Sequence, residues 1–159
     1  MNFDHSKIEA LQSGNAYLDN LIEQFLQEFS DRISNCRTIG DKILLGLHVG
    51  SKNNRQQTIT IGIIKVPDDP FLLNSNNSSV LFLSRIGKIK SNEDLSEILR
   101  YAFGIHYSGV VMEDDQTVCL KHTIDEIEEI SLAKFSIAIL EMAHHADVLE
   151  EILLEQDVN

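Results

Sequence analysis

Several residue types are scarce in this chain. It contains two prolines, two cysteines and no tryptophan, and its 13 lysines and arginines are outnumbered by 25 aspartates and glutamates. Nucleic acids and anionic membranes bind proteins through basic surfaces, so the shortage of basic residues makes both poor partners. No apolar run reaches the ~18 residues of a membrane-spanning helix. The low proline and glycine content also excludes collagen-like repeats and disorder rich in these residues.

The two cysteines, Cys36 and Cys119, are distant in the sequence and belong to no CxxC pair or zinc-like His/Cys spacing. We therefore expect two free thiols that pack as small apolar side chains. The N-terminus lacks the basic segment and apolar run of a signal peptide. Together these features favour a reducing cytoplasm and give no reason to expect a cofactor.

What remains is the composition of an ordinary globular protein, with 43% apolar and 24% charged residues. A chain of 159 residues can bury about 70% of the surface that it exposes when unfolded, so it needs no metal or disulfide to fold. No internal repeat or linker divides the sequence. We expect one domain over residues 1–159.

The negative charge is distributed unevenly along the chain. Residues 124–159 carry ten acidic residues and one lysine, whereas residues 1–123 carry fifteen acidic and twelve basic residues. The C-terminal segment is either a solvated helix face, which is the commoner arrangement, or a surface that attracts cationic partners.

Hydrophobic spacing predicts three helices and five strands. In chain order we expect a helix over 15–35, strands over 43–49, 59–63 and 80–83, a helix from Ser91 or Asn92 to Gly104, strands over 108–112 and 117–121, and a helix over 130–154. Ser91-Asn-Glu-Asp94 has the spacing of a capping box, with aspartate in place of the usual glutamate or glutamine. The order α-β-β-β-α-β-β-α favours an α+β fold, an antiparallel sheet with helices packed on one face.

The last helix is apolar on two sides. One stripe has the spacing of a helix face that packs on a sheet: Leu132, Phe135, Ile139, Met142, Ala143, Ala146, Leu149 and Leu153. The second set, Ile130, Ala133, Ile137 and Leu140, faces away from it in the N-terminal half. A helix with two apolar sides has to bury both, so this set contacts either a neighbouring helix of the same chain or a second subunit. We favour the second subunit, and therefore a homodimer.

The connection between the second and third strands, residues 67–79, is long. It contains three consecutive apolar residues without periodic spacing, Phe71, Leu72 and Leu73. These residues either cover the core, which is the commoner role, or lie at the edge of a protein-binding surface formed by the sheet and the first helix.

Few side chains suggest chemistry. Glu141 and His144 have the Glu-x-x-His spacing of di-iron sites, but such sites need two of these pairs and two further glutamates on four helices. Glu141 and His145 fit a helix-surface pair better. His122 could act as an acid or base, but no nucleophile lies beside it in the sequence. No P-loop, G-x-S-x-G, H-E-x-x-H or G-x-G-x-x-G motif is present, so we assign no catalytic and no metal-binding residue.

Three segments of the C-terminal half carry a resemblance. They are the helix SNEDLSEILRYAFGI, the hairpin YSGVVMEDDQTVCLKHTI and the helix ISLAKFSIAILEMAHHADVLEEIL. This pattern, over residues 91–153, resembles the YbjN family and the related class I type III secretion chaperone fold, and the order of elements agrees over 15–155. Such proteins are generally homodimers that bind protein segments along apolar patches, and the resemblance implies the same here.

The expected function is therefore a non-enzymatic protein-binding module, chaperone-like or adaptor-like, that acts as a homodimer on a protein partner whose identity the sequence does not reveal. Two alternatives stay open. One is a regulatory domain that binds a small ligand between helices and sheet. The other is a metal-dependent enzyme that uses the histidine and glutamate side chains of the last helix.

Overall fold

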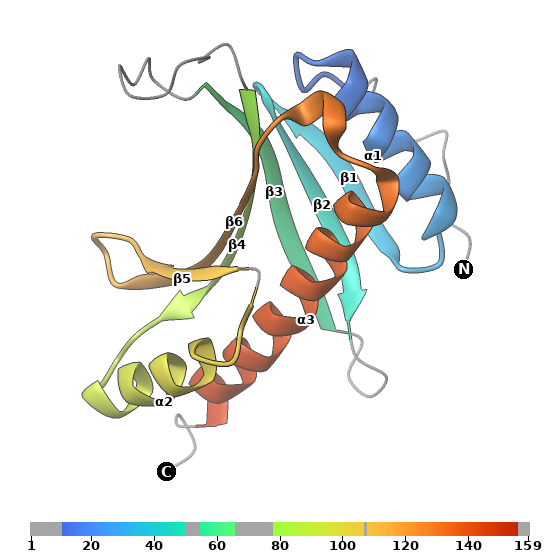
Figure 1. The fold of residues 1–159 in the computed structure, drawn as a ribbon. Coiled ribbons are helices and arrows are strands. Elements are labelled where there is room, and N and C mark those ends of the chain that lie inside the picture. The colour runs from blue at the N-terminus through green and yellow to red at the C-terminus, as the bar shows by residue number, and fades with distance from the viewer. Residues whose placement is uncertain (1–10, 50–54, 66–77, 107, 156–159) are drawn as a thin grey trace, which may run out of the picture.

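The computed structural model describes residues 11–49, 55–65, 78–106 and 108–155. Within these ranges six antiparallel strands form a sheet in the order β1-β2-β3-β4-β6-β5, with α-helices packed on one face (Figure 1). In chain order the elements are α1 (Ala16–Glu28), β1 (Ile33–Ile39), β2 (Lys42–Val49), β3 (Arg55–Lys65), β4 (Ser78–Lys88), α2 (Asn92–Ala102), β5 (Gly109–Met112), β6 (Thr117–Ile124), the short 3₁₀ turn η2 (Ile127–Glu129) and α3 (Leu132–Glu155). The expected α+β fold is confirmed. No helix of the described ranges is long and apolar enough to cross a membrane.

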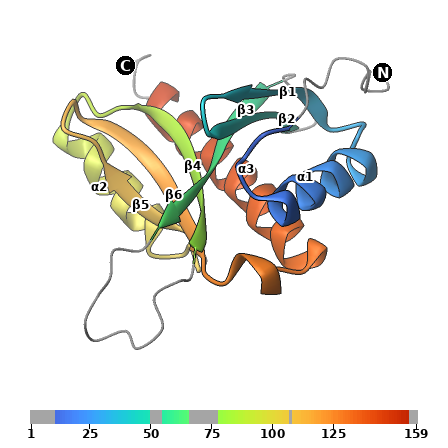
Figure 2. The ribbon, with the colours of Figure 1, turned by 90° about the horizontal axis from the view of Figure 1, so that it is seen from above.

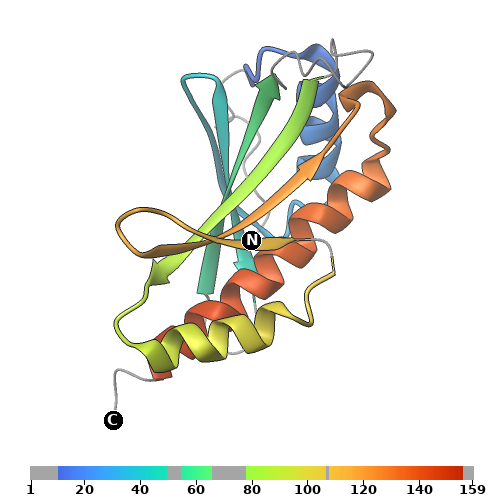
Figure 3. The same cartoon turned by 60° about the vertical axis from the view of Figure 1, so that its left-hand side comes forward.

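The helix α3 organises the helical layer. It contacts β2, β3, β4 and β6, and also both other α-helices. It runs diagonally across the sheet, with α1 beside its N-terminal half and α2 beside its C-terminal half (Figures 1 and 3). Seen from above, the twisted sheet curves partly around α3 (Figure 2). Each of the two shorter helices is therefore positioned mainly by where it meets α3.

The strands alternate between core-facing and outward-facing residues. The register aligns Leu45 with Ile59 in one row, and Ile43, Ile61 and Phe82 in the next. All five side chains are completely buried beneath the helices. Alternation of this kind lets one face of an antiparallel sheet form the core while the other remains outside it. The strand β4 occupies the central position expected from its apolar sequence.

Three phenylalanines from distant parts of the chain meet in the core. Phe135 of α3 lies edge-on to Phe25 of α1 and to Phe82 of β4, with ring centroids 6.1 and 5.5 Å apart. Edge-to-face pairs at such distances add to the stabilisation that burial alone provides. Nearby, the Tyr17 hydroxyl donates a hydrogen bond of 2.9 Å to the Ile130 carbonyl oxygen. These contacts attach α1 to the beginning of α3.

The apolar stripe predicted for the last helix is confirmed. Leu132 is half-buried, and the other members are buried: Phe135, Ile139, Met142, Ala143, Ala146, Leu149 and Leu153. The helix itself begins at Leu132 and not at Ile130. Ile130 closes the preceding 3₁₀ turn, where its backbone N–H donates to the carbonyl oxygen of Ile127.

The prediction that the first helix extends to residue 35 is wrong. The helix ends at Glu28, and a strand, β1, begins at Ile33. Ile33 continues the four-residue spacing from Phe25 and Phe29, so the helical pattern extends by coincidence into the strand. On β1 the buried positions are Ile33 and Cys36. The sheet therefore gains a strand at its edge that periodicity did not indicate.

The pairing of β1 with β2 is irregular at its beginning. The register shifts between Ile33 and Asn35, opposite Gly46 and Leu47. A side chain at Gly46 would collide with the side chains of Ser34 and Asn35. A glycine is needed here because two polar side chains fold over the backbone of β2.

The capping box predicted for the second helix is present. The Ser91 hydroxyl accepts a hydrogen bond from the Asp94 backbone N–H, and the Asp94 carboxylate accepts from the backbone N–H groups of Lys90 and Ser91. Hydrogen bonds from the Lys90 backbone and from Ser91 lower the pKa of Asp94, because they stabilise its charged form. The start of α2 is therefore fixed locally, independently of tertiary packing.

Candidate functional site

The helix α2 leaves most of its apolar side chains outside the core. Its buried residues are Asp94 and Ile98. Leu99 is 57% exposed, and Phe103, which directly follows the helix in helical conformation, is 94% exposed. Leu95 lies one turn before Leu99 and is half-buried. A phenylalanine that is almost fully exposed has gained nothing from folding, so this helix presents a surface that folding alone does not explain.

The strand β5 adds to this surface. Met112, the last residue of β5, is 57% exposed, and β5 contacts α2. We refer to Leu95, Leu99, Phe103 and Met112 as the α2 surface. Methionine is unbranched and flexible, which suits it to contacts with a partner of imperfect fit. The α2 surface therefore combines a rigid aromatic side chain with an adaptable one.

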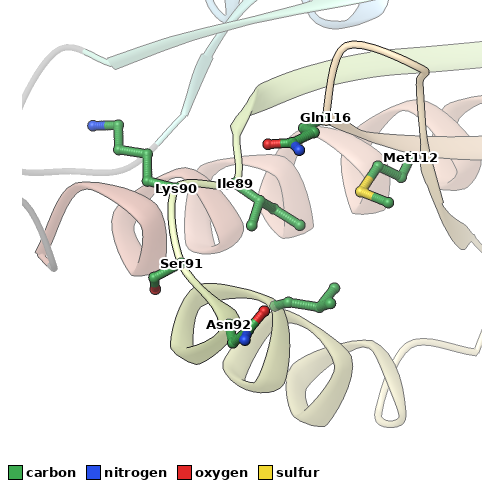
Figure 4. A pocket seen from close by; sticks show the side chains of 7 residues that line it. Ile89, Lys90, Ser91, Asn92, Met112 and Gln116 are labelled. Atoms are coloured by element: carbon green, nitrogen blue, oxygen red, sulfur yellow. The ribbon is translucent and has the colours of Figure 1, made fainter.

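A hollow of about 440 Å³ opens where the N-terminal end of α2 faces the β5–β6 turn (Figure 4). Ile89 and Met112 project into it, and Leu95 supplies its third apolar wall. The rest of its lining is polar: Lys90, Ser91, Asn92 and Gln116. The Ser91 hydroxyl is engaged in the capping box. The hollow thus has an apolar side and a polar rim.

A polar contact joins α2 to α3. The Tyr101 hydroxyl lies 2.8 Å from Nδ1 of His145, and the two rings are edge-on with centroids 5.8 Å apart. Burial lowers the pKa of His145, and the neighbouring His144 lowers it further, whereas Glu141 acts in the opposite direction. Burial also raises the pKa of Tyr101. The pair is therefore favoured as neutral phenol and neutral imidazole.

Part of the acidic segment attaches α3 to the edge of β3. Arg55 lies 3.4 Å from the Asp147 carboxylate and 3.8 Å from that of Glu151. The Gln57 side-chain amide donates a hydrogen bond of 2.7 Å to Glu150. These acidic residues have partners inside the domain and do not form a purely solvated face.

The histidines of α3 do not gather with other metal-ligating groups. Among the described residues no cluster of three or more histidine, cysteine, aspartate or glutamate side chains could hold a metal ion. His144 is exposed, while His145 turns toward Tyr101. Cys36 and Cys119 are free and buried, as expected. Burial raises the pKa of the Cys36 thiol to about 11 and also raises that of Cys119, so neither is poised as a nucleophile.

The residues predicted for a dimer interface are separated by the fold. Ile130 is completely buried inside its own subunit, so it has no surface to offer a partner. Ala133 is exposed, Ile137 is 53% exposed and Leu140 is half-buried. An interface at these last three positions stays a prediction. The other predicted site, formed by Phe71, Leu72 and Leu73, lies outside the described residues.

Sequence reasoning missed the α2 surface. Leu99 and Phe103 belong to the same apolar pattern as Leu95 and Ile98, and the whole pattern was assigned to the core. A weak signal was available, because five apolar residues in so short a helix exceed what one neighbouring helix covers. Which of them lack cover follows only from the tertiary arrangement.

Comparison with models of known protein families and with curated proteins gives no match for this chain. The geometry described above therefore supplies the grounds for a functional proposal.

Proposed function

We propose that this chain is a non-enzymatic protein-binding module, chaperone-like or adaptor-like, that acts as a homodimer. The observation that carries the proposal is the α2 surface, in which Phe103 is 94% exposed and Leu99 and Met112 are each 57% exposed. Monomeric proteins seldom leave apolar side chains of this size exposed together, and where they do, the patch commonly binds another protein. The resemblance to the YbjN family and to class I type III secretion chaperones supports the same proposal.

A second surface suits the partner protein. The register places Leu44, Thr60 and Leu83 in one row across β2, β3 and β4. This row alternates with the core-facing residues, so it lies on the face of the sheet away from α3. Leu44 and Leu83 are half-buried, which leaves apolar area for an extended segment of a partner. The segment with Phe71, Leu72 and Leu73 remains the proposed edge of this partner-binding face.

The homodimer is tested by light scattering coupled to gel filtration. We expect a mass of twice the 17.9 kDa of the chain at micromolar concentration. A monomer mass there would contradict the dimer.

The partner-binding face is tested by substitution of Leu83. Leu83→Thr keeps a β-branched residue in the strand but removes apolar area, so partner capture from the source cell should fall. The matched control is Ile39→Thr, because Ile39 is an exposed aliphatic residue of the edge strand β1. The melting temperature of both variants is measured alongside. Equal capture by wild type and Leu83→Thr would place the partner elsewhere.

The hollow beside α2 supports a second candidate, the regulatory domain for a small ligand. Its volume of about 440 Å³ lies within the roughly 300–1,000 Å³ of small-molecule sites. A thermal-shift screen of a metabolite library tests this candidate. A ligand that raises the melting temperature of wild type, and does so less for Leu95→Ala, would favour it over the protein-binding module.

A further inference from the structure

The α2 surface and the hollow lie at opposite ends of the same helix. Phe103 projects at the C-terminal end, and the hollow is bounded by Ser91 and Asn92 at the N-terminal end. A two-fold symmetric interface buries the same patch on both subunits, so a projection on one copy has to meet a recess on the other. A helix with one feature at each end meets this requirement when it packs antiparallel to its own copy.

Charge also distinguishes this region from the rest of the molecule. The chain carries a formal net charge of −12, with ten acidic residues and one lysine in residues 124–159. Residues 88–112, which carry α2 and β5, hold three basic and three acidic residues and are neutral. Two copies of a strongly acidic protein repel each other least when they approach through a neutral face.

The sequence of α2 is self-complementary in the antiparallel direction. Glu93, Ser96, Arg100 and Phe103 are all exposed, and their spacing of three, four and three residues places them on one side of the helix. When two α2 helices pack antiparallel about an axis close to Ser96, Glu93 of one copy lies opposite Arg100 of the other. The small side chain of Ser96 at the crossing lets the helices approach closely.

The same register brings Phe103 to the hollow. Glu93 and Arg100 are related by a midpoint between residues 96 and 97, and this midpoint relates position 103 to position 90. Phe103 of one copy therefore lies opposite Lys90 of the other, which lines the hollow together with Ile89 and Met112. Its ring meets the apolar walls there, while the polar rim stays at the boundary.

We infer that the homodimer forms through the α2 surface, with the two α2 helices antiparallel and Phe103 of each copy inserted into the hollow of the other. This inference rests on the proposed homodimer and names its interface. Phe103 and the hollow supply the buried anchors at which interface energy concentrates. The two Glu93–Arg100 pairs fix the direction of packing more than they add affinity.

The first test compares two single substitutions by sedimentation over a dilution series. Phe103→Asp should raise the dimer dissociation constant at least about thirty-fold, which corresponds to loss of one interface hot spot. The matched control is Ile137→Asp on α3, because Ile137 is also an exposed large apolar residue, 53% exposed. It should leave the dissociation constant unchanged. Both positions are exposed, so circular dichroism and melting temperature of the isolated subunits should be unaffected.

The outcomes separate the inference from the proposed function. A wild type that is monomeric at micromolar concentration contradicts the homodimer and, with it, this interface. A dimeric wild type that Phe103→Asp leaves intact overturns the interface alone. Dissociation by Ile137→Asp without dissociation by Phe103→Asp transfers the interface to α3 and keeps the homodimer.

A charge exchange tests the antiparallel register. Glu93→Arg and Arg100→Glu should each weaken the dimer severalfold, because each places like charges opposite one another. The double variant carrying both substitutions should recover the wild-type dissociation constant. Failure of the double variant to recover would overturn the antiparallel arrangement.

Discussion

The helices α1 and α2 have similar lengths, 13 and 11 residues, and both lie against α3, yet folding uses them differently. The buried residues of α1 are five apolar side chains: Leu18, Leu21, Ile22, Phe25 and Leu26. Those of α2 are Asp94, which serves the helix cap, and Ile98. The first helix is thus a core element. The second is attached at a few points and keeps its remaining apolar residues for contacts outside the subunit.

The comparison is sharpest at the two phenylalanines. Phe25 is completely buried between Phe29 and Phe135, so Phe25→Ala should lower the free energy of unfolding by about 3–5 kcal/mol through lost burial and the cavity left behind. Phe103→Ala should change it by less than about 0.5 kcal/mol, because the side chain is exposed. Both are measured by denaturant unfolding at concentrations where the subunits are monomeric. Comparable losses at the two sites would contradict the division between the helices.

The single aliphatic anchor of α2 gives the next largest effect. Ile98 is completely buried. Ile98→Ala should cost about 2 kcal/mol, at the lower end of the range for such changes, because a loosely attached helix can settle into the space. Hydrogen exchange should show lost protection confined to α2. Loss of protection that reaches α1 would mean that the two helices unfold together.

The cap of α2 comes third. Ser91→Ala removes the acceptor for the Asp94 backbone N–H and should lower the free energy of unfolding by about 1 kcal/mol. The corresponding change in α1 is Asn15→Ala, since the Asn15 side chain caps that helix by accepting from Tyr17 and Leu18. Ser91→Ala should loosen α2 without affecting α1, and Asn15→Ala the reverse, as read from hydrogen exchange of each helix.

The smallest effect is a pH dependence at the contact between α2 and α3. The pKa of His145 is lowered from 6.5 in the folded protein, so near pH 6 the unfolded chain binds more protons than the folded one. Stability from this residue is complete above the unfolded pKa and falls as the pH drops through 6.5 toward the lower folded value. His145→Gln should flatten this part of the melting profile between pH 7.5 and 5. An unchanged profile would show that another group titrates there.

Much of the fold was predictable because it depends on local spacing. The alternation of Ile59, Ile61 and Ile63 identified β3, and the apolar stripe of α3 identified the face that meets the sheet. Local spacing failed at Ile33, where one residue fits both a helical and an extended pattern. It could not show that Ile130 is buried by its own chain, because that depends on segments far away in sequence.

The α2 surface was hidden for a related reason. Periodicity shows that Leu99 and Phe103 are apolar and share a side of a helix, but not whether another element covers that side. The attachment of α3 to β3 was equally invisible, since Arg55 and Asp147 are 92 positions apart. Contacts made only in three dimensions decided both cases.

The irregular pairing at the start of β1 has a consequence for solubility. A sheet that ends in exposed strands can recruit strands from other molecules and grow into aggregates. One outer strand of the described sheet, β1, begins with a register shift in which Ser34 and Asn35 fold over Gly46, and the other, β5, spans only Gly109–Met112. Distorted and short edges are poor templates for strand addition. The protein can therefore expose apolar side chains on a helix while discouraging uncontrolled assembly through its backbone.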